Sequence, residues 1–143
     1  MQVKDIMTRD VEMISSDAKI IEAAQKMKLL EIGALPVWEG DELVGIITDR
    51  DITVRAIANG KDPAAAQVSE IMTPQIFYCY QDDDIRHAAR MMEEKSVRRL
   101  LVLGSESEPV GFLSLADFSV KCRDERLTGE VLEKVSEPAC PHR

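Results

Sequence analysis

The chain has 143 residues, which corresponds to one domain or to two small ones that share a core. Its 18 Lys and Arg stand against 26 Asp and Glu, and the net charge of −8 argues against a protein that follows the phosphate backbone of a nucleic acid. No apolar run approaches the ~20 residues of a transmembrane helix, and the N-terminus shows no apolar signal region. We therefore expect a cytoplasmic protein that binds neither nucleic acid nor a membrane.

The first predicted elements are a short strand over 11–14 and an amphipathic helix over 17–30. Five apolar residues of this helix recur at helical spacing: Ile20, Ala23, Ala24, Met27 and Leu30. The two alanines suit the close approach of a neighbouring helix or sheet.

A β-hairpin and a second helix follow. The apolar runs 34–38 and 43–47 are joined by a Gly/Asp turn at 39–41. The second helix begins near 49–51 and ends at Asn59-Gly60, since glycine is the usual residue just past a helix. The first half therefore predicts strand, helix, strand, strand, helix.

The second half of the chain repeats the first. The opening segment Val3–Thr8 returns as Val68–Thr73, with Met7 and Met72 separated by 65 residues. The apolar residues of the first helix return as Ile85, Ala88, Ala89 and Met92. The short strand returns over 76–80 and the hairpin over 100–103 and 110–113. A unit of ~60 residues is marginally stable alone, so we expect two copies to pack together and to form two related clefts.

Beyond Asp117 the sequence departs from the repeat. The apolar residues at 118, 120, 127, 131, 132 and 135 form one stripe that is interrupted at Thr128-Gly129. This pattern predicts a helix that extends the second unit, then a short tail helix that ends at Pro138 and Pro141 and packs on the module or on a second copy.

The most informative motif is GIITDRD at 45–51, which is echoed by GFLSLAD at 111–117. In both, a strand ends in a hydroxyl residue, and an aspartate three positions later opens a helix. One interpretation is a helix cap, in which Thr48 or Ser114 is the N-cap residue. The other is a ligand site, in which Asp51 or Asp117 accepts two hydrogen bonds from a ribose diol beside the N–H groups of a helix start. The duplication of both positions favours the ligand site.

Two arginines, Arg98 and Arg99, precede a buried strand. Their stems could lie on apolar surface, or their guanidinium groups could hold phosphate in bidentate contacts. The first repeat has Gly33-Ala34 at these positions, which leaves the backbone open for a flat base, and Arg50 could add a further cation. The two clefts are therefore expected to be chemically unequal.

The tandem repeat resembles a pair of CBS domains, the Bateman module. The resemblance is carried by DIMT at 5–8, IGALPV at 32–37, GIITDRDI at 45–52 and their second-half partners, and it covers about residues 2–119. It implies an α+β fold of two β-α-β-β-α units packed through their sheets with pseudo-two-fold symmetry. The repeats would span 1–63 and 64–122, followed by a helical tail over 123–143. It also implies a disk-shaped homodimer.

The resemblance further implies that each cleft binds an adenosine nucleotide (AMP, ADP or ATP) as a regulatory ligand, with or without Mg²⁺. The ribose carboxylates would be Asp51 and Asp117, with Thr48 and Ser114 beside them. The cleft of Ser114 and Asp117 would be lined by Thr8, Ile32, Gly33 and Ala34, and that of Thr48 and Asp51 by Thr73, Val97 and Arg98. Arg50, Arg98 and Arg99 would neutralise phosphates, and Phe112, in the place of Ile46, would narrow one cleft.

The sequence contains no nucleophile elbow, P-loop or metal-binding helix motif, so we expect neither an enzyme nor a metal site. The principal hypothesis is a non-catalytic sensor that binds an adenosine nucleotide and changes its association with a regulated protein partner. The alternative is a structural or interaction module that binds no nucleotide, in which the hydroxyl–aspartate pairs are only caps.

A third hypothesis is a redox-responsive protein that uses Cys79, Cys122 or Cys140. The three cysteines stand far apart and include no C-x-x-C pair, which is unlike a disulfide framework or a structural zinc site. The pattern favours two partly buried thiols and one in the tail.

Overall fold

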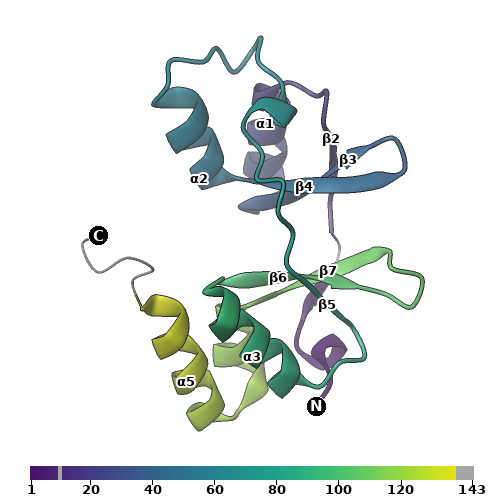
Figure 1. Cartoon of the computed structure of the whole chain (residues 1–143), viewed down its shortest axis with the longest axis vertical. Helices are drawn as coiled ribbons and strands as arrows, with labels where there is room; N and C mark the ends of the chain where they lie inside the picture. The colour runs from purple at the N-terminus through teal and green to yellow at the C-terminus, as the bar shows by residue number, and fades with distance from the viewer. Residues whose placement is uncertain (10, 138–143) are drawn as a thin grey trace. The chain divides into compact units, whose positions relative to one another are not determined.

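The computed structural model describes residues 1–9 and 11–137, which fold into two compact units (Figure 1). Unit 1 is formed by Met1–Val11 together with the chain from Phe77 onwards, and unit 2 by Glu12–Ile76. Within the described residues, every helix is too short or too polar to cross a membrane.

Unit 2 has a three-stranded sheet with helices packed against it. The strands are β2 (Ile14–Ser15), β3 (Ala34–Glu39) and β4 (Glu42–Thr48), in the order β2-β3-β4. The helices are α1 (Ile20–Leu30), α2 (Asp49–Asp51), which runs on as the π-helical segment η2 (Ile52–Ile57), and the 3₁₀ turn η3 (Val68–Glu70). The apolar stripe of α1 buries Ile20 and Ala23 against Leu35 and Val37 of β3 and Ile47 of β4. The predicted hairpin is thus confirmed.

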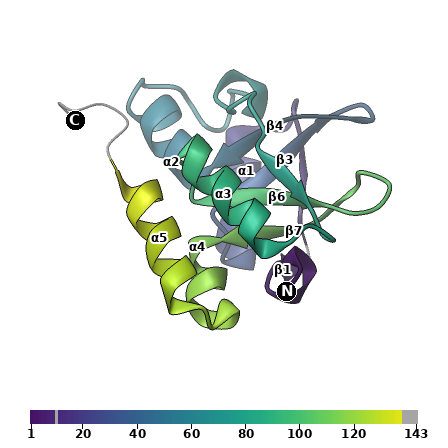
Figure 2. The ribbon, with the colours of Figure 1, turned by 60° about the horizontal axis from the view of Figure 1, so that its bottom comes forward.

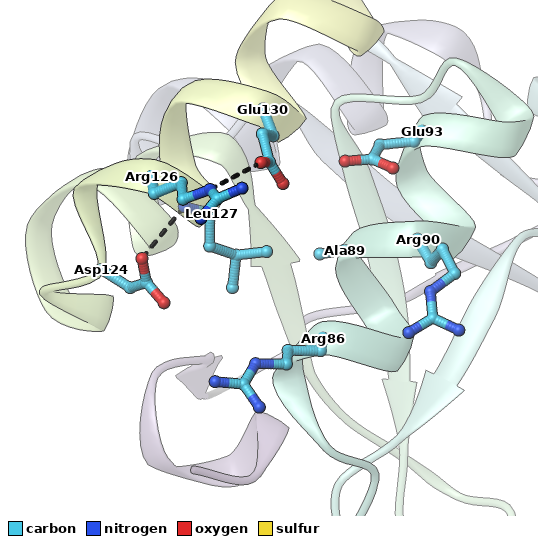
Figure 3. Close-up of a pocket in the computed structure, with 8 residues that line it drawn as sticks. All are labelled: Arg86, Ala89, Arg90, Glu93, Asp124, Arg126, Leu127 and Glu130. Carbon is cyan, nitrogen blue, oxygen red and sulfur yellow. Dashed lines mark hydrogen bonds and ion pairs between the residues drawn. The ribbon is translucent and has the colours of Figure 1, made fainter.

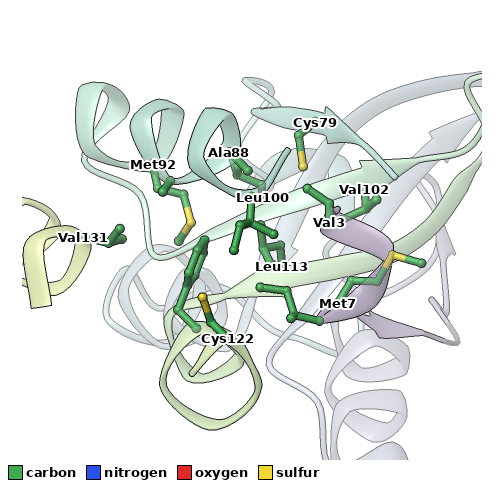
Figure 4. Close-up of a cluster of buried hydrophobic side chains, with 14 of the residues drawn as sticks. Val3, Met7, Cys79, Ala88, Met92, Leu100, Val102, Leu113, Cys122 and Val131 are labelled. Carbon is green, nitrogen blue, oxygen red and sulfur yellow. The ribbon is translucent and has the colours of Figure 1, made fainter. Parts of the chain in front are cut away.

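Unit 1 repeats this plan with a fourth strand and an extra helix. Its strands are β1 (Thr8–Arg9), β5 (Tyr78–Tyr80), β6 (Arg99–Leu103) and β7 (Pro109–Ser114), in the order β1-β7-β6-β5. Its helices are η1 (Val3–Asp5), α3 (Ile85–Lys95), α4 (Leu115–Asp117), which runs on as η4 (Phe118–Cys122), and α5 (Glu125–Ser136). Figure 4 shows one cluster that joins Val3 and Met7 from the leading segment to Leu113 of β7 and Val131 of α5.

The compact units do not coincide with the sequence repeats, because the leading segments are exchanged. The segment before the first repeat's helix joins unit 1, where Thr8 pairs with Phe112 and Arg9 with Gly111. The corresponding segment of the second repeat joins unit 2, where the backbones of Ile46 and Thr73 exchange two hydrogen bonds of 2.9 and 2.8 Å. The exchange brings a threonine from each repeat to the hairpin of the other.

The helix ends agree with the sequence signals in one place and differ in another. After η2, Gly60 has φ +71°, as expected of a glycine that follows a helix. The predicted helical extension and tail helix are η4 and α5, and α5 runs through Thr128 and Gly129, where the apolar stripe is interrupted. The break between η4 and α5 lies earlier, at Arg123, which has φ +59°. Asp124 then caps α5 by accepting a hydrogen bond of 3.0 Å from the backbone N–H of Leu127.

The predicted short strands were too long. The strand expected over 11–14 begins only at Ile14 and runs one residue further, to Ser15, and the one expected over 76–80 is Tyr78–Tyr80, because these are the residues that pair with a neighbouring strand. The tail helix α5 lies beside α3 and α4 within unit 1 (Figure 2). Its expected end at Pro138 and Pro141 lies outside the described residues.

Candidate functional site

Each of the two repeated motifs closes a reciprocal cap around a buried aspartate. In unit 2, Asp51 donates its backbone N–H to Thr48 Oγ1 (3.1 Å), and the N–H of Thr48 donates to Asp51 Oδ2 (3.0 Å). In unit 1, Asp117 donates to Ser114 Oγ (3.3 Å), and the N–H of Ser114 donates to Asp117 Oδ2 (2.9 Å). These are capping boxes, and the two aspartates are only 8% and 5% exposed.

A second hydroxyl reaches each aspartate from the exchanged leading segment. Thr8 Oγ1 donates to Asp117 Oδ1 at 3.1 Å in unit 1. Thr73 Oγ1 donates to Asp51 Oδ1 at 3.5 Å in unit 2. The structure therefore brings together two equivalent trios of a carboxylate and two hydroxyls, and each trio lies inside one unit. We call them the unit 1 site (Thr8, Ser114, Asp117) and the unit 2 site (Thr48, Asp51, Thr73).

A cation one helical turn further on accompanies each aspartate. Arg55 Nε lies 3.6 Å from Asp51 Oδ1, and Lys121 Nζ lies 3.5 Å from Asp117 Oδ1. Both basic side chains are about half exposed, so each pair contributes at most about 1 kcal/mol to stability. Neither cation was predicted from the sequence, although the i, i+4 spacing from an aspartate in a helix was a usable signal.

Two glycines make room for the exchanged segments. A Cβ on Gly45 would lie 2.6 Å from the backbone oxygen of Thr73, and one on Gly111 would lie 2.5 Å from that of Thr8. Both are distances that a side chain cannot occupy without moving the backbone. The glycine that opens each motif is thus a positioning residue for the threonine of the trio, a role that the sequence analysis did not assign.

The segments 32–34 and 97–99 each lie beside the motif of their own repeat. Ala34 pairs with Thr48 across the hairpin in unit 2, and Arg99 pairs with Ser114 in unit 1. The resemblance had assigned each segment to the cleft of the opposite motif. The hairpin of each unit holds the segment against the strand that ends in its own motif, and the contribution of the segment to the opposite cleft stays a prediction. Any further role of Ile32 or Val97, which are both half-buried, stays a prediction.

The remaining expected residues lie around the same strands. Ile46 pairs with Pro36 and with Thr73, and its counterpart Phe112 pairs with Leu101 and with Thr8. Arg50 is exposed in the first turn of α2. A hollow of about 370 Å³ in unit 2 is lined by Asp49, Arg50, Thr53 and Val54.

A second hollow, of about 330 Å³, lies between α3 and α5 in unit 1 (Figure 3). It contains none of the expected residues. Three arginines and three acidic residues line it together with Ala89 and Leu127: Arg86, Arg90, Arg126, Glu93, Asp124 and Glu130. Arg126 already pairs with Glu130 at 3.3 Å, and the mixed charge shows no pattern that would select a nucleotide. The two aspartate sites are the better candidates.

The cysteines give the redox hypothesis no support. Cys79 and Cys122 are both buried and unpaired. Burial, together with the nearby Asp83, raises the pKa of the Cys79 thiol to about 12, which disfavours the reactive thiolate. Cys140 lies outside the described residues.

Comparison with known proteins identifies the repeats. The family model described as CBS domain matches twice, at residues 3–56 and 68–121. The CBS domain-containing protein YhcV of Bacillus subtilis is 34% identical over 134 residues, which is 94% of each chain.

Solved structures also resemble the chain. The structure of Hypoxic Response Protein I with two coordinated zinc ions is 34% identical, covers 83% of this chain and 97% of its own, and gives a TM-score of 0.71. The CBS domain pair of protein MJ0100, in complex with 5′-methylthioadenosine and S-adenosylmethionine, is 30% identical over 91% of this chain and 97% of its own, with a TM-score of 0.73. In the part of this chain that the structure describes, no three His, Cys, Asp or Glu side chains cluster in a way that could hold a metal ion.

The two family matches account for both copies of the repeat. The two α+β units have the same fold as the units of solved CBS pairs. The chain therefore belongs to the CBS domain family, as a tandem pair of CBS domains.

Proposed function

We propose that this CBS pair is a non-catalytic regulatory module that binds an adenosyl ligand at the unit 1 site, the unit 2 site or both. The observation that carries the proposal is the second hydroxyl of each trio. A helix cap needs only the hydroxyl–aspartate pair, and it does not explain why Thr8 and Thr73 reach the same carboxylates from exchanged segments. The 5′-methylthioadenosine and S-adenosylmethionine bound by the MJ0100 pair support a ligand of this class.

The chemistry of the trio fits a ribose. The hydroxyls of a ribose diol can donate to a carboxylate oxygen, and the Ser or Thr hydroxyls beside the aspartate can both donate and accept. In each site Oδ2 is held by the capping box, whereas among residues 1–9 and 11–137 the partners of Oδ1 are a threonine hydroxyl and a half-exposed cation. We infer that a diol takes over the bonds at Oδ1, where those partners are the easiest to displace.

Regulation would work by a shift in the populations of two conformations of the protein. A ligand at the unit 1 site would contact both the leading segment, through Thr8, and the hairpin motif, through Asp117. It would therefore favour the state in which β1 is paired with β7. Because β1 continues directly into unit 2, we expect a regulated protein partner, or a second copy of this chain, to respond to that state.

The proposal is tested by the melting temperature of the purified protein with AMP, ADP, ATP, S-adenosylmethionine, NADH and GTP, each with and without Mg²⁺. A ligand at ~100 times its Kd adds about 2.7 kcal/mol to the free energy of unfolding, which raises the melting temperature by several degrees. We expect adenosyl compounds to raise it and GTP to leave it unchanged. The control is the double variant Asp51→Asn, Asp117→Asn, which should lose the rise.

The competing function is an interaction module that binds no nucleotide. It is favoured by the fact that both carboxylates already accept bonds from a cap and a threonine. Under it, no adenosyl compound changes the melting temperature of the original protein or of the double variant.

A further inference from the structure

The two sites carry different charges at one equivalent position. What we infer from this difference rests on the proposed function. We propose that the unit 1 site takes a phosphorylated adenosine nucleotide, and that the unit 2 site takes an adenosyl compound without phosphate that is neutral or cationic.

The equivalence of the position follows from a repeated backbone hydrogen bond. In unit 2 the first residue of α2, Asp49, donates its N–H to the backbone oxygen of Gly33 at 3.0 Å. In unit 1 the first residue of α4, Leu115, donates its N–H to the backbone oxygen of Arg98 at 3.1 Å. The pairs Gly33/Asp49 and Arg98/Leu115 are therefore structural counterparts. One pair carries a carboxylate, and the other carries a guanidinium.

In unit 2 the carboxylate of Asp49 fills the space beside Gly33. A Cβ placed on Gly33 would lie 3.1 Å from Asp49 Oδ2 and 3.5 Å from Oδ1. The N–H of Arg50 donates to Asp49 Oδ1 at 2.9 Å, which fixes the carboxylate in this place. The unit 2 site therefore has a second negative charge two residues before Asp51, close to the open backbone at Gly33.

In unit 1 no carboxylate stands at the equivalent place, because Leu115 replaces Asp49. Arg98 and Arg99 are exposed, and among the described residues neither forms an ion pair. Arg99 pairs directly with Ser114, so its side chain leaves the sheet on the face of the Ser114 hydroxyl. Two unpaired guanidinium groups next to the unit 1 site suit a phosphate chain, to which they can make bidentate bonds.

The carboxylate of Asp49 predicts the opposite ligand preference for the unit 2 site. A phosphate next to Asp49 meets a like charge, whereas the sulfonium of S-adenosylmethionine meets an opposite one. Since Asp49 is exposed, screening by solvent limits the effect, and we expect about a tenfold preference.

The experiment measures one site at a time by calorimetric titration. The Asp51→Asn protein keeps the unit 1 site intact, and the Asp117→Asn protein keeps the unit 2 site intact. We expect the first to bind ATP about tenfold more tightly than S-adenosylmethionine, and the second to show the reverse order. At higher salt the binding of ATP to the Asp51→Asn protein should weaken, because its extra affinity is electrostatic.

Charge variants then identify the residues responsible. In the Asp117→Asn protein, Asp49→Asn keeps the side-chain volume and should raise the affinity for ATP while lowering that for S-adenosylmethionine. In the Asp51→Asn protein, Arg98→Gly should lower the affinity for ATP about tenfold. Arg90→Ala, which removes an exposed arginine of α3 that belongs to neither trio, is the matched control and should change neither affinity.

The two claims fail differently. If both single-site proteins bind and prefer the same ligand, or if Asp49→Asn and Arg98→Gly leave the preferences unchanged, the division by charge is wrong and the proposed function stands. If neither single-site protein nor the unmutated chain binds ATP or S-adenosylmethionine, the proposed function fails as well.

Discussion

At the residue scale, Asp51 and Asp117 serve the fold and the candidate function with different oxygens. One carboxylate oxygen closes the capping box, and the other faces a threonine from the exchanged segment. The sequence predicted the pair of hydroxyl and aspartate because three-residue spacing is local. The sequence did not predict the ion pairs that Arg55 and Lys121 form with these aspartates. It also did not predict the structural role of Gly45 and Gly111, since that role depends on which distant segment approaches the motif.

The dual role predicts a difference between two substitutions of Asp117. Asp117→Ala removes the acceptor of the Ser114 N–H and should lower the free energy of unfolding by about 1 kcal/mol. Asp117→Asn keeps an acceptor oxygen and should cost less, yet it should weaken ligand binding, because an amide accepts at only one of its two terminal atoms. Urea unfolding measures the first effect and calorimetry the second. Equal destabilisation by both substitutions would show that the cap depends on the charge alone.

Burial of Cys79 predicts how stability changes at alkaline pH. The folded chain holds this thiol protonated up to a pKa of about 12, whereas the unfolded chain releases the proton near 9.0. Between these values the unfolded state binds fewer protons, so the free energy of unfolding should fall as the pH rises. Cys79→Ala should flatten this dependence in chemical unfolding, and Cys79 should resist alkylation at pH 8. Rapid alkylation of Cys79 in the folded protein would contradict the assignment and reopen the redox hypothesis.

At the scale of elements, helix α5 and the two leading segments depart from the sequence pattern for physical reasons that the structure shows. Thr128 and Gly129 have low helix propensity, yet α5 runs through both of them. The Thr128 hydroxyl donates to the backbone oxygen of Phe118 at 3.1 Å, and tertiary packing overrides the propensity. The repeat bounds placed the leading segments in their own repeats because these segments are adjacent to them in sequence, whereas the family resemblance placed Thr8 and Thr73 at the opposite motifs. Their exchange follows from long-range strand pairing, which no local pattern encodes.

The close approach of β1 to β7 predicts that Gly111 cannot be replaced without cost. Gly111→Ala places a Cβ against the backbone oxygen of Thr8, so it should separate β1 from β7, destabilise unit 1 and remove the Thr8 bond to Asp117. Gly129→Ala is the matched control, because nothing lies within 4 Å of its Cβ, and in α5 it should stabilise by about 0.5–1 kcal/mol. Thermal unfolding compares the two, and equal effects would refute the role of Gly111.

The packing of α5 predicts that this helix is part of the core of unit 1. Val131 is fully buried in the cluster with Phe118 and Met92, so Val131→Ala should cost about 2 kcal/mol. Leu132, the next residue of the same helix, is 52% exposed, and Leu132→Ala should change the free energy of unfolding by less than about 0.5 kcal/mol. Similar costs for the two substitutions in urea unfolding would mean that α5 does not pack as described.

At the scale of the whole molecule, duplication with exchange explains both the fold and the pair of sites. Neither repeat alone contains a complete trio, since each supplies its threonine to the other's hairpin. The two trios arise from the same backbone plan, and they differ in the charges that surround them. The family resemblance placed Thr8 with Asp117 and Thr73 with Asp51, and the pairing of the exchanged segments with the hairpins gives the structural reason for these contacts.

The central claim is that adenosyl ligands bind at these two trios. The most direct test is a titration followed by the backbone amide signals in two-dimensional NMR spectra, with ATP and S-adenosylmethionine as the added compounds. The account predicts that the largest changes occur at Thr8, Ser114 and Asp117 with one ligand and at Thr48, Asp51 and Thr73 with the other. Changes that gather instead at Arg86, Arg90 and Arg126 in the hollow between α3 and α5, or no changes at all, would contradict it.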